Sequence, residues 1–99
     1  MSTMTVWGVV NKDGSINSSS GGFSVTHQGH GEYTISFSPA FSATPAITGS
    51  QVLFAQDNQS TLDGIVFPYL NSGAATVFTG DGGGSQEARS FSFIAMGPE

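Results

Sequence analysis

The stretch FSVTHQGHGEYTISF, residues 23–37, contains two runs in which apolar and polar residues alternate, separated by a glycine-rich turn. In a β-strand successive side chains point to opposite faces of the sheet, so strict alternation places one set of residues on a single face. That set comprises Phe23, Val25 and His27 in the first run and Tyr33, Ile35 and Phe37 in the second. A short loop, Gly29-His30-Gly31, joins the runs, and the sequence therefore predicts an antiparallel hairpin.

Similar β-favouring segments lie on both sides of this hairpin, each bounded by Gly, Asn, Asp, Ser or Pro. The expected strands are residues 5–10, 46–54, 62–70, 74–79 and 90–96, and residues 15–22 are expected to form a loop. Pro68 cannot donate a backbone hydrogen bond, so its strand should lie at a sheet edge or contain a bulge. Phe41, in the proline-containing connection before residue 46, should turn inward. We predict an all-β fold, a small antiparallel β-sandwich of six to seven strands, in one domain of residues 1–99.

Composition excludes several classes of protein. The net charge is −5, with Lys12 and Arg89 as the only Lys and Arg residues, and a nucleic-acid-binding protein needs a basic face that two cations cannot form. No window approaches the roughly 20 apolar residues of a membrane span, so no membrane insertion is expected. The chain has no cysteine, and no cofactor is expected.

The residues of the hairpin and its sequel resemble a known pattern. GHGEYTISFSPAF, residues 29–41, followed by SATPAI, is similar to the "G-x-Y-x-I-x-F … F-x-x-x-P-A" pattern of C-terminal domains of phage tail fibres. The same order of features resembles the H-type lectin domain, a six-stranded sandwich that forms trimers and binds N-acetylgalactosamine. The resemblance covers residues 23–97, which would form the family-like core, with residues 1–22 as an N-terminal strand and loop. It implies a homotrimer or a hexamer that binds a cell-surface glycan.

The resemblance also suggests where a ligand would bind. The H-type lectin positions that hold the sugar, an Arg and a Trp-His pair, match Asp63, Asp81 and Gly82 in this sequence. Family-type galactosamine specificity is therefore not expected. We predict instead that a different glycan is held by Asp63, Asp81, Gly82 and Gln51, together with backbone groups of residues 80–84, which are expected to form a flexible loop.

Other candidate sites have simpler interpretations. His27 and His30 could bind metal only with further donors, because ligation needs three or more, and we favour solvent-facing roles. A hydrolase is not expected, since the sequence lacks a G-x-S-x-G elbow, an H-E-x-x-H motif and a P-loop. Trp7 lies in an apolar run, which favours burial within one chain or between chains.

Two functions follow from these expectations. The first is a trimeric, non-enzymatic module that binds a receptor or glycan on the surface of a virion or another extracellular particle. The alternative is a purely structural module that trimerises a larger protein and binds no ligand. The family-like pattern consists of core and turn residues, so it indicates the fold more directly than it indicates the function.

Overall fold

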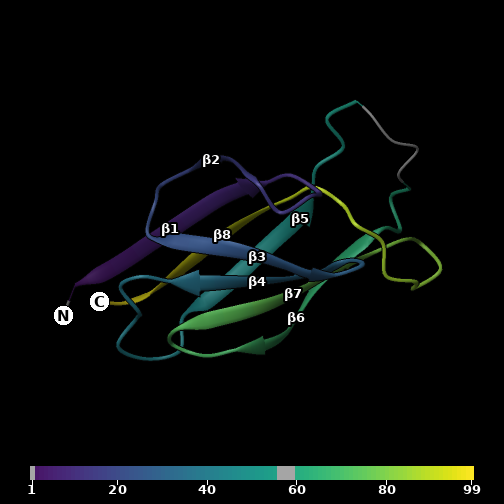
Figure 1. Cartoon of the computed structure of the whole chain (residues 1–99). Coiled ribbons are helices and arrows are strands. Elements are labelled where there is room, and N and C mark those ends of the chain that lie inside the picture. The colour runs from purple at the N-terminus through teal and green to yellow at the C-terminus, as the bar shows by residue number, and fades with distance from the viewer. Residues whose placement is uncertain (1, 56–59) are drawn as a thin grey trace.

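The computed structural model of the chain describes residues 2–55 and 60–99, and it shows eight β-strands in two antiparallel sheets packed as a sandwich (Figure 1). The strands are β1 (Thr3–Val10), β2 (Ile16–Ser19), β3 (Phe23–Gly29), β4 (Glu32–Phe37), β5 (Ala46–Gln51), β6 (Gly64–Leu70), β7 (Ala74–Gly80) and β8 (Phe91–Pro98). One sheet has the order β2-β1-β8-β5 and is called here the β1–β8 sheet. The other has the order β3-β4-β7-β6 and is called the β4–β7 sheet. The predicted antiparallel sandwich is confirmed.

The hairpin predicted from residues 23–37 forms as expected. Strands β3 and β4 pair antiparallel, with Phe23 opposite Phe37, Val25 opposite Ile35 and His27 opposite Tyr33. The second run alternates between buried and half-exposed positions along its whole length, so its apolar residues point into the sandwich. The alternation in the sequence therefore reports the core face of this hairpin directly.

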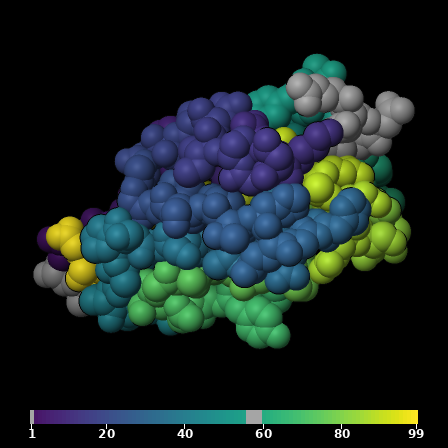
Figure 2. Space-filling model, viewed as in Figure 1, coloured from purple at the N-terminus to yellow at the C-terminus, as the bar shows by residue number. Residues whose placement is uncertain are grey.

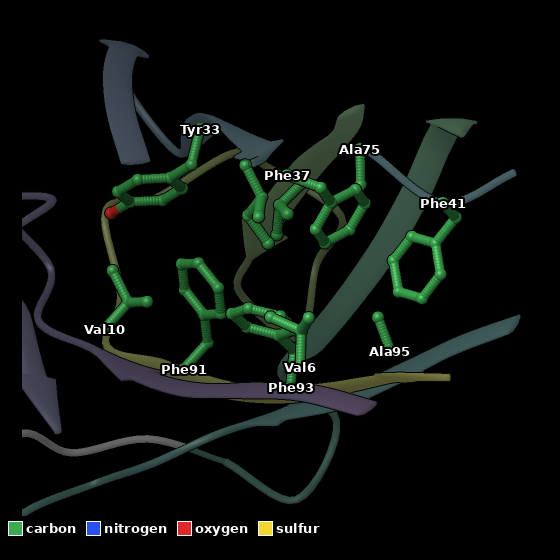
Figure 3. Packing of buried hydrophobic residues seen from close by; sticks show 11 residues of the cluster. Val6, Val10, Tyr33, Phe37, Phe41, Ala75, Phe91, Phe93 and Ala95 are labelled. Atoms are coloured by element: carbon green, nitrogen blue, oxygen red, sulfur yellow. The ribbon is translucent and has the colours of Figure 1, made fainter. Parts of the chain in front are cut away.

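Aromatic rings fill much of the space between the sheets (Figure 3). Phe93 meets Phe23 edge to face at a centroid distance of 5.0 Å, and Phe41 meets Phe37 in the same way at 5.0 Å. Such edge-to-face pairs add to the gain from burying the rings, because the edge of one ring faces the electron-rich face of the other. Phe41 comes from the connection between β4 and β5 and is buried in the core, so its predicted inward position is confirmed.

The strands differ from the predicted ones in two respects, whereas the prediction for Pro68 is confirmed. Residues 16–19 form strand β2 rather than a loop, because this polar segment pairs with β1 at a sheet edge and needs no apolar face. Strand β5 ends at Gln51 and β6 begins at Gly64, so both are shorter than predicted. Pro68 lies in an edge strand, β6, whose register with β7 shifts between Val66 and Tyr69, as its missing donor predicts.

Trp7 is not buried within the chain, and this part of the prediction is wrong. Its side chain lies on the outer face of the β1–β8 sheet and is 41% exposed. The inward positions of β1 are occupied by its neighbours Val6 and Gly8, which are buried. Because β1 carries apolar residues on both faces, its sequence does not show which face points inward.

The sandwich is elongated, with principal extents of 43 × 23 × 22 Å. Both chain ends lie at one end of the long axis, where the backbone N–H of Glu99 donates to the carbonyl of Ser2 at 2.9 Å. The opposite end carries the turns 11–15 and 30–31 and the loop segments 52–55, 60–63 and 81–90, and is called here the loop end (Figure 1). Across residues 2–55 and 60–99 we find no helix with the length and apolarity to cross a membrane.

Candidate functional site

The loop end gathers most of the charged residues that the structure describes. Two cations, Lys12 and Arg89, lie there, and the acidic residues are Asp13, Glu32, Asp63, Asp81 and Glu87. Figure 2 shows residues 81–90, in yellow-green, forming this end of the molecule beside the tip of the β3–β4 hairpin. Five carboxylates against two cations make the described part of the loop end acidic, so it should repel anionic ligands.

Arg89 connects three elements at the loop end. Its Nη1 donates to Oδ2 of Asp63 at 2.7 Å, and it lies 3.4 Å from Oε1 of Gln51. The Arg89 and Asp63 side chains are only 17% and 5% exposed, so water screens this ion pair little. The hydrogen bond from Arg89, followed by that from the backbone N–H of Ser60, holds the pKa of the Asp63 carboxyl below its ordinary value of 3.8. The pair therefore fixes the loop before β6 against the segment before β8.

Gln51 joins the two sheets at the same place. Its Nε2 donates to the carbonyls of Gly64 and Gly80, both at 2.7 Å, and these residues begin β6 and end β7. The structure thus brings together Gln51 and Asp63, two of the predicted ligand-binding residues, around Arg89. Their polar atoms take part in internal bonds, which suits them to position the loops. Direct contact of either side chain with a ligand stays a prediction.

Asp81 and Gly82 form part of a tight turn in the segment where the sequence predicts a loop. Oδ1 of Asp81 accepts hydrogen bonds from the backbone N–H groups of Gly83 at 2.9 Å and Ser85 at 3.0 Å. Its own N–H donates to the carbonyl of Ser85 at 2.9 Å, which closes the turn. A Cβ atom on Gly82 would lie 3.0 Å from Cβ of Leu62, so the turn packs closely on the loop before β6.

A shallow groove of about 370 Å³ runs between this turn and strand β6. The groove is lined by Leu62, Gly64, Val66, Phe78, Thr79, Gly80, Asp81, Gly82, Gly84 and Gln86. Leu62 is 75% exposed and Val66, which pairs with Phe78 across the strands, is 58% exposed. The groove therefore has an apolar wall on β6 and β7 and a polar rim on the turn, and includes two predicted site residues, Asp81 and Gly82.

The turn that forms the groove is supported from the core of the loop end. Oγ1 of the buried Thr79 donates to the carbonyl of Glu87 at 2.6 Å, and the Glu87 N–H donates back to the Thr79 carbonyl at 3.0 Å. Gly31 has a φ of +76°, and a Cβ there would lie 2.7 Å from the Thr79 carbonyl oxygen. Glycine is required at this position by both its backbone conformation and the close approach of Thr79.

The histidines occupy separate environments. His27 stacks on Tyr33 with a centroid distance of 4.5 Å and an interplanar angle of 13°. His30 Nε2 lies 2.9 Å from Oε2 of Glu87 at the surface. No group of three or more His, Cys, Asp or Glu residues that could hold a metal ion occurs among the residues that the structure describes.

A second hollow of about 520 Å³ lies on another side of the loop end. It is lined by Asn11, Lys12, Asp13, Asn17, Phe54 and Ser90. Phe54 and Ala55 have φ values of 52° and 58°, so the segment after β5 adopts a left-handed backbone that is uncommon outside glycine. Two of the side chains that line this hollow are bonded to each other, with Nδ2 of Asn17 donating to Oδ1 of Asn11 at 3.4 Å. The groove is the more apolar of the two and the better candidate for a ligand.

Sequence reasoning missed Arg89 and the apolar wall of Leu62, Val66 and Phe78 as parts of a site. The signal for Arg89 was its being the only arginine in an acidic chain, where a partly buried carboxylate would need a partner. The signal for the wall was that residues 62–70 contain more apolar residues than one core-facing side of a strand can hold, so some of them must lie on the outer face. Comparisons of the chain with protein-family models, with curated proteins and with solved structures give no match.

Proposed function

We propose that the chain is a non-enzymatic recognition module that binds an uncharged glycan in the groove at the loop end, and that it acts as a homotrimer. The observation that carries this proposal is the groove itself, with its apolar wall on β6 and β7 and its polar turn at residues 80–86. Ligand sites of proteins commonly combine apolar walls with a few placed polar groups.

The chemistry of the groove suits a sugar ring. A sugar presents C–H groups on its faces and hydroxyls at its edge, so it needs an apolar platform and hydrogen-bonding groups beside it. Leu62, Val66 and Phe78 supply the platform. The turn uses Oδ1 of Asp81, and a carboxylate has lone pairs on both oxygens, so Oδ2 is suited to accept a hydrogen bond from a hydroxyl. The amide of Gln86 adds a donor and an acceptor.

The charge of the loop end supports an uncharged ligand. Five carboxylates and two cations among the described residues give this end a negative field, which opposes sulfated, phosphorylated or sialylated ligands. Arg89 is paired with Asp63, so the charges of these two residues largely cancel at a ligand and the field comes mainly from the other four carboxylates. We therefore favour a neutral glycan over an anionic one.

The shape of the molecule supports presentation of this site to a surface. Both chain ends lie at the end opposite the groove, so a larger protein joined at either end would leave the loop end open (Figure 1). Three copies in one particle would raise weak single-site binding through a high effective concentration. This arrangement fits the tail-fibre and H-type lectin resemblance and a location on a virion or another extracellular particle.

A glycan array followed by titration with the best soluble hit tests this proposal. Leu62→Ser removes most of an exposed apolar side chain from the wall, worth about 1.5 kcal/mol or roughly tenfold in affinity. Asp81→Asn keeps an oxygen for the turn and removes the charge, and should also weaken binding. Ile16→Ser, an equal change at an apolar residue of β2 that is 42% exposed, is the control and should bind as the wild type does.

The results separate the proposed function from its alternative. Neutral hits that weaken in Leu62→Ser but not in Ile16→Ser support the groove. An array without hits, for a protein that still forms a trimer, would instead favour the structural trimerisation module. Hits confined to anionic glycans would refute the argument from the acidic loop end.

A further inference from the structure

The outer face of the β1–β8 sheet carries a continuous apolar patch. Trp7 of β1 lies directly opposite Ile94 of β8, and Met96 follows two residues along β8. Their exposed fractions are 41%, 50% and 49%. Single exposed apolar residues are ordinary, but three large ones on neighbouring positions of adjacent strands form a patch that calls for an explanation.

The same face is free of charge. Strands β1, β2, β5 and β8, which the structure describes throughout, contain no Asp, Glu, Lys or Arg. Around the patch, the exposed positions are held by small residues such as Thr5, Ala46 and Thr48. The centres of protein interfaces are depleted in charged residues and enriched in aromatic residues and Met, and this face has that composition.

A second copy of the chain is the partner that this face fits. The chain has a net charge of −5, so contacts between copies through the acidic loop end would bring like charges together. The uncharged sheet face avoids that repulsion. Its strands β1, β2, β5 and β8 have eight, four, six and eight residues, which at about 3.3 Å per residue and about 4.8 Å between strands give one face an area of about 400 Å². Three such faces turned toward a common axis cover about 1,200 Å², which is within the range of specific interfaces.

We infer that this chain self-associates through the outer face of the β1–β8 sheet, with Trp7, Ile94 and Met96 at the centre of the contact. The inference rests on the oligomeric part of the proposed function and gives that oligomer its surface, which lies apart from the groove. In a closed ring of copies whose axis runs along the strands, every loop end points the same way. Several grooves would then face one target surface together.

The fluorescence of the wild-type chain tests the inference without mutation, because Trp7 is its only tryptophan. On dilution from a concentration at which sedimentation shows an oligomer, the emission of Trp7 should move to longer wavelength. Its quenching by acrylamide should increase over the same range in which the mass falls to that of one 10.2 kDa chain. A chain that is monomeric at 100 µM, or an oligomer that dissociates without any change at Trp7, would overturn the inference.

A matched pair of variants assigns the contact to this face. Ile94→Glu places a carboxylate at its centre and should weaken self-association at least tenfold, and Met96→Glu should act in the same direction. Thr26→Glu adds the same charge at an exposed position of β3, in the other sheet, and should associate as the wild type does. Far-UV circular dichroism checks that each variant is folded. If the folded Ile94→Glu and Met96→Glu variants retain the wild-type mass, the assignment is refuted.

The same variants separate this inference from glycan binding. Folded, monomeric Ile94→Glu should bind a soluble glycan at each site with wild-type affinity and lose only its avidity for a glycan-coated surface. Leu62→Ser should lose glycan affinity with its oligomeric mass unchanged. Failure of the first result alone would count against this face, and failure of the second alone against the groove.

Discussion

Replacing Tyr33 by phenylalanine removes one hydroxyl from the centre of the structure. The ring of Tyr33 is fully buried and stacked on His27. It is also tilted against Phe91 at a centroid distance of 5.1 Å, and Figure 3 shows these two rings between the sheets. Its hydroxyl donates to the carbonyl of Lys12 at 2.6 Å, which ties β4 to the turn between β1 and β2. The hydroxyl also lies 3.4 Å from the carbonyl of Arg89. Phenylalanine keeps the ring contacts, so the substitution tests the hydrogen bonds of the hydroxyl.

The expected loss of stability depends on the hydrogen bond that is removed and on whether the Lys12 carbonyl finds another donor. A neutral hydrogen bond contributes about 0.5–1.5 kcal/mol net, and a buried carbonyl left without a donor costs about 1–3 kcal/mol. The Lys12 carbonyl lies in a surface turn, where water can replace part of the lost bond. We therefore expect Tyr33→Phe to lower the free energy of unfolding by about 1 kcal/mol near neutral pH.

The pH dependence of this difference has a definite sign. Desolvation by burial raises the pKa of the Tyr33 hydroxyl above its ordinary value of 10.0. The folded state therefore holds this proton more tightly than the unfolded state, and the stabilisation is complete below pH 10. It is lost as the pH rises through the folded-state pKa. Since phenylalanine does not ionise, the advantage of the wild type over Tyr33→Phe should shrink above pH 10.

Equilibrium unfolding in urea, followed by far-UV circular dichroism at one protein concentration, measures both effects. For a chain of this size the dependence on urea is about 1 kcal/mol per molar, so the midpoint should fall by about 1 M at neutral pH. Tyr69→Phe, which changes the same group on a ring that is 72% exposed, is the control and should change stability by less than about 0.5 kcal/mol. Equal stability of the wild type and Tyr33→Phe at pH 7, or a difference that grows above pH 10, would refute the reasoning.

Three further substitutions test the support of the core and loop end, each measured by urea unfolding. Gly31→Ala should lower the free energy of unfolding by about 2 kcal/mol or more. A left-handed backbone costs a residue with a Cβ about 1–2 kcal/mol, and the new Cβ would also press on the Thr79 carbonyl oxygen. A loss below about 0.5 kcal/mol would contradict this. Phe93→Ala should cost about 3–5 kcal/mol by opening a cavity, and a smaller loss would mean that the sheets close over it. The pKa of the Asp63 carboxyl is lowered in the folded state, so its ionisation stabilises the fold above pH 3.8 and this contribution is lost as the pH falls. Asp63→Asn removes the ionisable group and weakens the bond to Arg89, so the free energy of unfolding of this variant should depend less on pH between pH 4 and pH 2. An unchanged dependence on pH would argue against this role of Asp63.

The strands with one buried face were predictable from the sequence, whereas the site was predictable only in part. The hairpin of residues 23–37 alternates because one side faces the core, and its two strands pair antiparallel in the structure, as predicted. Strand β2 was missed because INSS has no apolar alternation and an edge strand requires none. For Trp7 only burial within the chain is wrong, and burial between chains stays a prediction. Because β1 is apolar on both faces, its alternation does not show which face points inward.

The arrangement at the loop end depends on contacts between distant parts of the chain. Arg89 meets Asp63 and Gln51 only because β8, β6 and β5 bring three loops to one place. No local pattern encodes that meeting. Asp63 was singled out as a ligand contact, and its bonds show that it also holds the architecture around the groove. Arg89, the partner of the Asp63 carboxylate, lies 26 residues away in the sequence, so the ion pair could not be predicted from the residues around Asp63.

The pairing of Glu99 with Ser2 has a practical consequence for protein engineering. Because the two ends of the folded chain meet, the domain can be inserted into a surface loop of another protein without stretching either connection. A few residues joining the ends would equally allow a circular permutant, with the chain opened at the Gly21-Gly22 turn. In both cases the loop end stays free, because the chain is joined or opened at the opposite end of the sandwich. The domain can therefore present grafted or randomised binding loops.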